Sequence, residues 1–188
     1  FSQIKTYPTL ITSLNFWLPT STFALSFSIF GIFFIGGPYV AVKVFNLSPT
    51  VMGIYLASPA LGYVLGNILV SRIANLVSTK NLMVFGSLIL VLGPCSSLLL
   101  SNFFLHPLSF YLPILIMTFG SGIIWPASNA EIVKAIPHLA GSASGLGSAI
   151  MTLMSSFAAF LTGIYIEGSN PLDFVCYFLI LVGLLSFF

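Results

Sequence analysis

Long apolar runs without charged residues dominate this sequence and limit the folds that it can adopt. No charged residue lies between Lys5 and Lys43, and a helix needs only about 20 apolar residues to cross a hydrocarbon core of about 30 Å. Charged residues make up 4% of the 188 residues, against about 25% in a soluble domain. The sequence therefore predicts an integral membrane protein, and it argues against a soluble enzyme, a secreted disulfide scaffold or a nucleic-acid binder.

Six runs are predicted to form membrane helices. They cover residues 15–39, 49–70, 81–105, 108–130, 140–166 and 172–188. The runs are continuously apolar instead of alternating, which favours helices over barrel strands, so the expected fold class is an all-α membrane bundle. The last run gives only about 22 Å of helix from Phe174 onward, and the chain begins with Phe1. We therefore expect a fragment that is cut at both ends.

Basic residues at the ends of the runs predict an orientation. In a six-span arrangement Lys5, Arg72, Lys80 and Lys134 fall on one side of the membrane, and Lys43 falls on the other. Lysine and arginine are more frequent on the cytoplasmic side. The side that carries four basic residues, and with it the N-terminus of this chain, is therefore predicted to be cytoplasmic.

Small residues recur every four positions in the second and fifth runs. They are Ser58, Gly62 and Gly66 in one run and Gly141, Gly145 and Ala149 in the other. This spacing allows two helix backbones to approach closely, although generic bundle packing would also use it. A small-residue middle helix in each set of three suggests two inverted three-helix repeats, which are typical of transporters. Asn67, near the end of the second run, is predicted to hydrogen-bond between helices.

The sequence lacks the residue patterns of an intramembrane enzyme or a metal site. It has no HExxH motif, no Cys/His cluster and no paired carboxylates within a run. The stretch from Ser142 to Gly145 resembles the serine motif of rhomboid proteases, but no His follows Ser144 to act as its base. We therefore predict no enzyme activity, no cofactor and no metal. Proton carriers need an ionisable residue at mid-membrane, and none occurs in these runs.

Two runs carry a helix face that suits a lipophilic ligand. The first presents Thr20, Phe23, Phe27, Phe30 and Phe34 at steps of three or four, and the fourth presents Tyr111, Thr118, Trp125 and Asn129. We predict that these faces form an apolar cavity wall with a few polar points. Lipid contact or helix packing is the alternative for the phenylalanines, and anchoring at the membrane interface is the alternative for Trp125.

Several stretches, in order along the chain, resemble one transporter family. They are Gly37-Pro38-Tyr39-Val40, Leu47-Ser48-Pro49, Gly66-Asn67 with Arg72, and the stretch from Pro137 to Gly145. Together they resemble the C-terminal half of bicyclomycin-resistance (Bcr/CflA-type) drug exporters in the major facilitator superfamily. The loop from Gly66 to Lys80 is similar to the basic cytoplasmic loop of that superfamily, although Ser71 stands where an Asp is usual.

The resemblance implies a fold and a function. The six runs would be helices seven to twelve of a twelve-helix carrier in the inner membrane, and the first and fourth runs would line its cavity. The second and fifth runs would meet the other half, with Gly62, Gly66, Gly141 and Gly145 allowing the halves to slide at close range. Such carriers export small lipophilic drugs in exchange for protons. The implied partners are a small-molecule substrate, the lipid bilayer, and an N-terminal six-helix half that handles the protons.

Two alternatives stay open from the sequence alone. The chain could be a non-transporting truncated protein from a split or decaying gene, or it could belong to a carrier of a neutral metabolite. A carrier of a charged metabolite would normally place a charge in its cavity helices, and the runs at 15–39 and 108–130 contain none. The sequence therefore favours neutral or lipophilic cargo.

Overall fold

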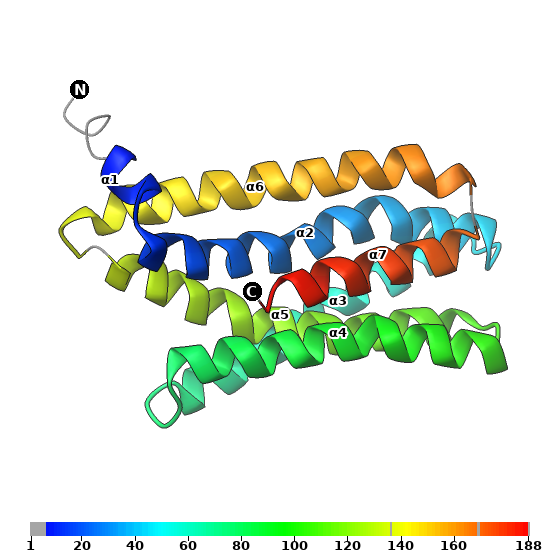
Figure 1. Cartoon of the computed structure of the whole chain (residues 1–188). Coiled ribbons are helices and arrows are strands. Elements are labelled where there is room, and N and C mark those ends of the chain that lie inside the picture. The colour runs from blue at the N-terminus through cyan, green and yellow to red at the C-terminus, as the bar shows by residue number, and fades with distance from the viewer. Residues whose placement is uncertain (1–6, 136, 169, 188) are drawn as a thin grey trace.

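The computed structural model describes residues 7–135, 137–168 and 170–187, and over these residues it is a bundle of long helices with no strand (Figure 1). The prediction of an all-α membrane fold is confirmed. The helices are α1 (Tyr7–Ile11), α2 (Leu14–Lys43), α3 (Pro49–Ile73), α4 (Thr79–Phe103), α5 (Pro107–Ala135), α6 (Ala140–Tyr165) and α7 (Pro171–Leu185). Short 3₁₀ turns, η2 (Pro137–Leu139) and η3 (Ile166–Gly168), flank α6.

Five of the helices in the described part of the chain are long and apolar enough to cross a membrane. They are α2, α3, α4, α5 and the helical stretch that contains α6, while α7 is a shorter apolar helix of 15 residues. Both α2 and α5 continue past the predicted limits at residues 39 and 130, because a helix need not stop at the edge of the hydrocarbon core. The predictions for Lys5 and Phe188 fall outside the described residues.

Local sequence explains where several of these helices begin. Proline occupies the first turn of α3 and of α7, after Ser48 and Asn170 respectively, where its missing N–H costs no hydrogen bond. The side chain of Ser78 accepts a hydrogen bond from the backbone N–H of Asn81 at 3.3 Å and caps α4. Between its two ends, each long helix is apolar on most faces, as expected for a helix that contacts lipid on one side and protein on the other.

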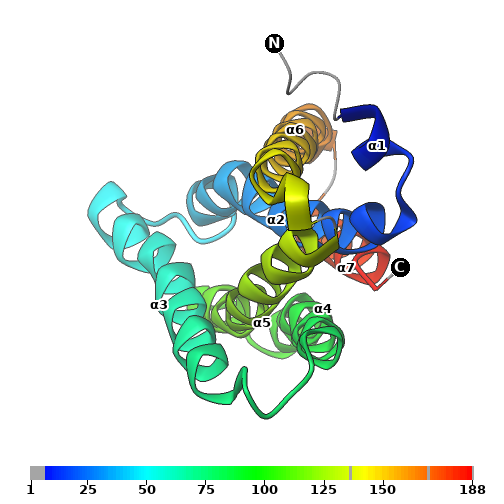
Figure 2. The same cartoon turned by 90° about the vertical axis from the view of Figure 1, so that its left-hand side faces the viewer.

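The two central helices are α2 and α5, and the others surround them (Figure 2). Helix α2 packs on α6 and α7, whereas α5 packs on α3 and α4, and α2 and α5 also contact each other. The two sets of three are α2–α4 and α5–α7. The first helix of each set thus packs on the second and third helices of the other set. This reciprocal arrangement is the one that two inverted three-helix repeats produce.

Candidate functional site

An aromatic cluster on the central helices is the main candidate site. Trp125 of α5 lies at its centre, with ring centroids 4.6 Å from Phe27, 5.0 Å from Phe30 and 6.5 Å from Phe23, all on α2. Tyr63 of α3 lies 4.8 Å from Trp125. We call these five residues the Trp125 cluster. The structure thus brings three phenylalanines of the predicted stripe together with the predicted tryptophan.

Sequence reasoning missed Tyr63. It lies beside Gly62, on the face of α3 that packs on α5. The family resemblance places the second run against another half of the protein, which gives no reason to expect Tyr63 beside Trp125. The signal was nevertheless present, because Tyr63 is an aromatic residue inside the small-residue pattern from Ser58 to Gly66.

Phe34 is not part of this cluster. It is 65% exposed, and its ring lies 6.0 Å from Phe30 and 6.4 Å from Phe33. The two predicted polar points, Thr20 and Thr118, are buried, and their hydroxyls donate to carbonyls of their own helices. The polar groups of both threonines are therefore engaged in local hydrogen bonds.

The remaining polar residues of the predicted α5 face lie on either side of the cluster. Asn129 is exposed one turn beyond Trp125, and its Oδ1 accepts a hydrogen bond from the Ser144 hydroxyl of α6 at 3.3 Å. At the other end of the face, Tyr111 is buried and donates to the carbonyl oxygen of Gly37 on α2 at 2.8 Å. Asn129 therefore joins α5 to α6, and Tyr111 joins α5 to α2.

The indole nitrogen of Trp125 is buried and makes no hydrogen bond within the described part of the chain. The rest of the ring is half-buried, as are those of Phe27 and Phe30. No acidic or basic side chain belongs to the cluster. The arrangement can therefore contact an uncharged apolar molecule over several ring faces, with the indole N–H of Trp125 as a hydrogen-bond donor at its centre.

The glycines predicted at helix interfaces have different surroundings in the two helices. A Cβ atom on Gly62 would overlap the carbonyl oxygen of Leu115, and one on Gly66 would overlap that of Phe119. Both glycines therefore allow α3 to approach α5 inside this bundle. A Cβ atom on Gly141 or Gly145 of α6 would have no described atom within 4 Å.

Asn67 is half-buried, and its side-chain amide donates to the Tyr63 carbonyl of its own helix at 3.0 Å. This bond differs from the contact between helices that was expected for Asn67. The bond instead holds the Asn67 side chain along α3, next to the tight contact of α3 with α5 at Gly122.

The predicted cytoplasmic loop ends at a small polar network. The Thr79 hydroxyl, at the start of α4, donates to Glu131 Oε1 near the end of α5, and Lys134 Nζ lies 3.3 Å from the same oxygen. Arg72 and Lys80 are both exposed. Sequence reasoning did not anticipate the link between α4 and α5, although Glu131 was visible as the one acidic residue within α5.

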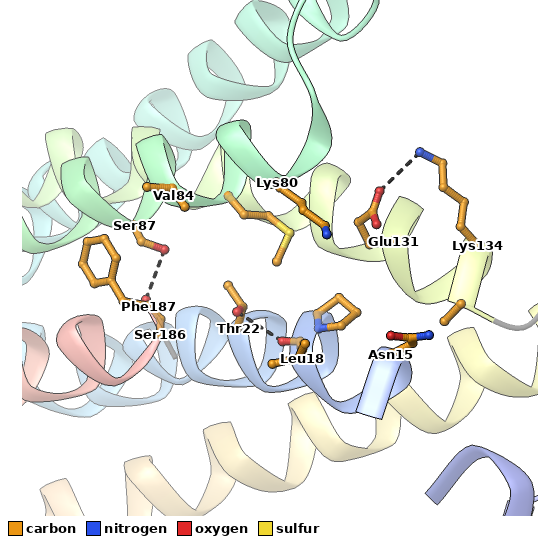
Figure 3. A pocket seen from close by; sticks show the side chains of 13 residues that line it. Asn15, Leu18, Thr22, Lys80, Val84, Ser87, Glu131, Lys134, Ser186 and Phe187 are labelled. Atoms are coloured by element: carbon orange, nitrogen blue, oxygen red, sulfur yellow. Dashed lines mark hydrogen bonds and ion pairs between the residues drawn. The ribbon is translucent and has the colours of Figure 1, made fainter. Parts of the chain in front are cut away.

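A crevice of about 460 Å³ lies apart from the Trp125 cluster, and none of the five cluster residues lines it (Figure 3). Its walls come from α2, α4, the end of α5 and the residues that follow α7. Lys80, Glu131 and Lys134 gather at one end of the crevice, and Ser87, Ser186 and Phe187 lie at the other, where the two serine hydroxyls are 3.4 Å apart. The sequence did not predict this crevice.

Comparison with known proteins places the chain in a family. The family model of the Major Facilitator Superfamily matches residues 1–159. A Bacillus subtilis (strain 168) protein named "Uncharacterized MFS-type transporter YdgK" is 24% identical over 155 residues, which are 81% of this chain and 38% of that protein. The chain thus spans less than half the length of this relative. Since the family match covers most of the chain and the helices are long and apolar, this multi-pass membrane protein belongs to the major facilitator superfamily.

Proposed function

We propose that this chain is the C-terminal half of a secondary active transporter that exports small lipophilic molecules, of the Bcr/CflA type. The Trp125 cluster is the observation that carries the proposal. Its rings come from α2, α3 and α5, and Trp125 contacts Phe27, Phe30 and Tyr63 at centroid distances of 4.6 to 5.0 Å. A wall of aromatic rings without acidic or basic groups suits uncharged cargo. Membership of a transporter family also favours transport over catalysis.

A second six-helix half is part of the proposal. Alternating access requires two bundles that rock about a site between them, and this chain corresponds to 38% of its relative. The acidic residues of the described chain are Glu131, near the end of α5, Glu167 in η3 and Asp173 in the first turn of α7. Since none lies in the middle of a span, we assign proton coupling to the N-terminal half.

Charge placement supports an orientation in the inner membrane. Arg72, Lys80 and Lys134 lie at the end of the bundle where α3 is followed by α4 and α5 by α6, whereas Lys43 lies at the opposite end (Figure 1). Glu167 and Asp173 lie at the same end as Lys43. By the preference of basic residues for the cytoplasm, we assign the end with Arg72, Lys80 and Lys134 to the cytoplasmic side.

A carrier of a neutral metabolite is the second candidate. The hydrogen bond between Asn129 and Ser144 favours it, because this pair offers polar groups one turn from Trp125. The two candidates differ in the cargo that the site would accept. A lipophilic exporter should act on apolar dyes, whereas a carrier of polar neutral metabolites should discriminate against them.

An export assay tests the proposed function. Cells that produce the native polypeptide carrying these 188 residues are loaded with Nile red, an uncharged lipophilic dye, and the dye remaining in the cells is followed by fluorescence. We expect faster loss of dye than in cells without the polypeptide, and we expect a proton ionophore to abolish the difference. Equal retention of dye, with the polypeptide shown to be in the membrane, would contradict lipophilic export.

An immunoblot tests the proposed second half. An antibody against a peptide from loop 72–80 should detect a native polypeptide of about twice the 20.2 kDa of this chain. A band at the mass of the chain alone would favour the truncated, non-transporting alternative. In that case a separate N-terminal partner would have to co-purify with the chain for the transport proposal to survive.

A further inference from the structure

The indole N–H of Trp125 differs from that of the other tryptophan in its hydrogen bonding. Trp17 Nε1 donates to the carbonyl oxygen of Ile11 at 2.6 Å. Trp125 Nε1 is buried and has no acceptor within the described part of the chain. Buried donors in folded proteins are nearly always paired, because an unpaired donor has lost its hydrogen bonds to water without replacement.

The other buried side-chain polar atom without a partner in the described residues is the hydroxyl oxygen of Ser128. A serine hydroxyl can rotate to a carbonyl three or four residues earlier in its helix, as Ser26 does to Phe23 at 3.0 Å and Ser28 does to Ala24 at 2.8 Å. The indole N–H is fixed in a rigid ring and cannot turn toward the backbone of α5 in this way. Trp125 therefore needs an acceptor from outside its own helix.

The surroundings of Trp125 restrict the chemical class of the molecule that carries this acceptor. The neighbouring rings of Phe27, Phe30 and Tyr63 offer flat apolar faces at centroid distances of 4.6 to 5.0 Å. No lysine or arginine belongs to the cluster to balance an anion, and no carboxylate to balance a cation. Aromatic rings alone can attract a cation, but a cation without a lone pair cannot accept the indole N–H.

We propose that Trp125 Nε1 donates a hydrogen bond to an acceptor atom on an uncharged, flat aromatic substrate, whose ring packs against Phe27, Phe30 and Tyr63. This inference rests on the proposed function, since it takes the Trp125 cluster as the cargo site. Phe27 and Phe30 are only half-buried, and the proposal requires their side chains to move and admit a ring beside the indole. Trp125 thereby favours substrates that carry a hydrogen-bond acceptor.

Three bicyclic probes of nearly equal shape separate the possible interactions. Quinoline carries a ring nitrogen that accepts hydrogen bonds, naphthalene has no acceptor, and N-methylquinolinium is a cation whose nitrogen is blocked. Binding of each labelled probe to the purified native polypeptide in lipid nanodiscs is measured by equilibrium dialysis. We expect quinoline to bind about threefold to tenfold more tightly than naphthalene, the size of effect that one neutral hydrogen bond gives.

Trp125→Phe should bind quinoline and naphthalene with equal affinity. The readout is the ratio of the two affinities, because the smaller ring of phenylalanine alters both, and this ratio should fall to about one. Trp17→Phe is the matched control, because it removes an indole N–H that is already paired, and it should keep the preference for quinoline. If Trp125→Phe does not fold, replacement of Trp125 by benzothienylalanine removes only the N–H and keeps the bicyclic shape.

Three results would overturn the inference. A preference for quinoline that persists in Trp125→Phe would place the donor elsewhere. Tightest binding of N-methylquinolinium, unchanged in Trp125→Phe, would identify a cation site. Failure of all three probes to bind, while Nile red export continues, would remove the inference and leave the proposed function intact. Loss of probe binding together with loss of Nile red export would contradict the proposed function as well.

Discussion

The hydroxyl of Tyr111 donates to the carbonyl oxygen of Gly37 at 2.8 Å and joins the two central helices near the end of the bundle that lies opposite Arg72 and Lys80. The ring of Tyr111 also stacks on Tyr55 of α3, with centroids 5.0 Å apart, and meets Phe33 of α2 edge-on at 6.3 Å. One side chain thus holds α2, α3 and α5 together. Tyr111 was predicted to share a ligand-facing surface, but its contacts are those of a residue that organises the bundle.

Replacement Tyr111→Phe should lower the stability of the bundle. The variant keeps the ring contacts and loses one buried hydrogen bond, which contributes about 1 kcal/mol. Thermal unfolding of the detergent-solubilised polypeptide, followed by circular dichroism, measures the change. Tyr177→Phe is the matched control, because Tyr177 is 64% exposed, and it should leave the midpoint unchanged. An unchanged midpoint in Tyr111→Phe would show that the bond to Gly37 adds nothing to stability.

Alanine should destabilise the bundle at Gly62 and have a smaller effect at Gly145. At Gly62 the new Cβ would overlap the carbonyl of Leu115 and the hydroxyl of Thr118, so α3 must move away from α5 at a cost of about 1–3 kcal/mol. At Gly145 no atom of the described residues lies within 4 Å of such a Cβ, so alanine meets no contact inside this bundle. Unfolding midpoints of the two variants provide the comparison. Equal midpoints would contradict the tight contact of α3 with α5.

The scarcity of charge and the lengths of the apolar runs were sufficient to predict the membrane fold and the approximate helix positions. Each run has to bury its backbone polar groups in a helix once it enters lipid, so the fold class followed from local composition. The packing partners of each helix did not follow from local composition. The small-residue spacing at Gly62 and at Gly145 is the same, yet only Gly62 faces another helix of this bundle, and that difference depends on how each helix is rotated about its axis.

The candidate site could be predicted only in part for the same reason. Helical periodicity placed Phe23, Phe27, Phe30 and Phe34 on one face, but Phe34 is 65% exposed and its ring lies beside Phe30 and Phe33. Phe23 and Phe34 share a helix face but are separated by about 16 Å along the helix axis, so the shared face does not bring both rings to one tryptophan. Tyr63 belongs to a different helix, and its place beside Trp125 depends on tertiary packing that no local pattern records.

Replacement Thr79→Val should loosen the contact between the start of α4 and the end of α5. Valine keeps the shape of threonine but cannot donate to the carboxylate of Glu131. A hydrogen bond to a charged group contributes about 1.5–3 kcal/mol when buried, and we expect about 1 kcal/mol here because Glu131 is partly exposed. Lys134→Ala, which removes an ion pair whose lysine is 64% exposed, should change the unfolding midpoint less. A larger effect from Lys134→Ala would reverse the assigned importance of the two contacts.

Replacement Gly145→Leu should reduce export without unfolding the bundle. No atom of the described residues lies within 4 Å of a Cβ built on Gly145, and the proposed N-terminal half would approach α6 there. A leucine side chain would prevent that close approach. Nile red export and the unfolding midpoint are measured on the same variant. Full export would show that α6 does not form a tight contact with a second half at this position.

Replacement Phe27→Ala should weaken cargo recognition, whereas Phe34→Ala should not. Both residues belong to the stripe on α2, but only Phe27 contacts Trp125, at a centroid distance of 4.6 Å. One aromatic contact contributes about 0.5–1.5 kcal/mol of interaction free energy. Since Phe27→Ala removes such a contact, we expect roughly threefold to tenfold less efficient Nile red export in this variant. Immunoblots confirm equal amounts in the membrane. Equal export by the two variants would show that contact with Trp125 does not determine cargo binding, because these substitutions remove the same side chain from the same helix.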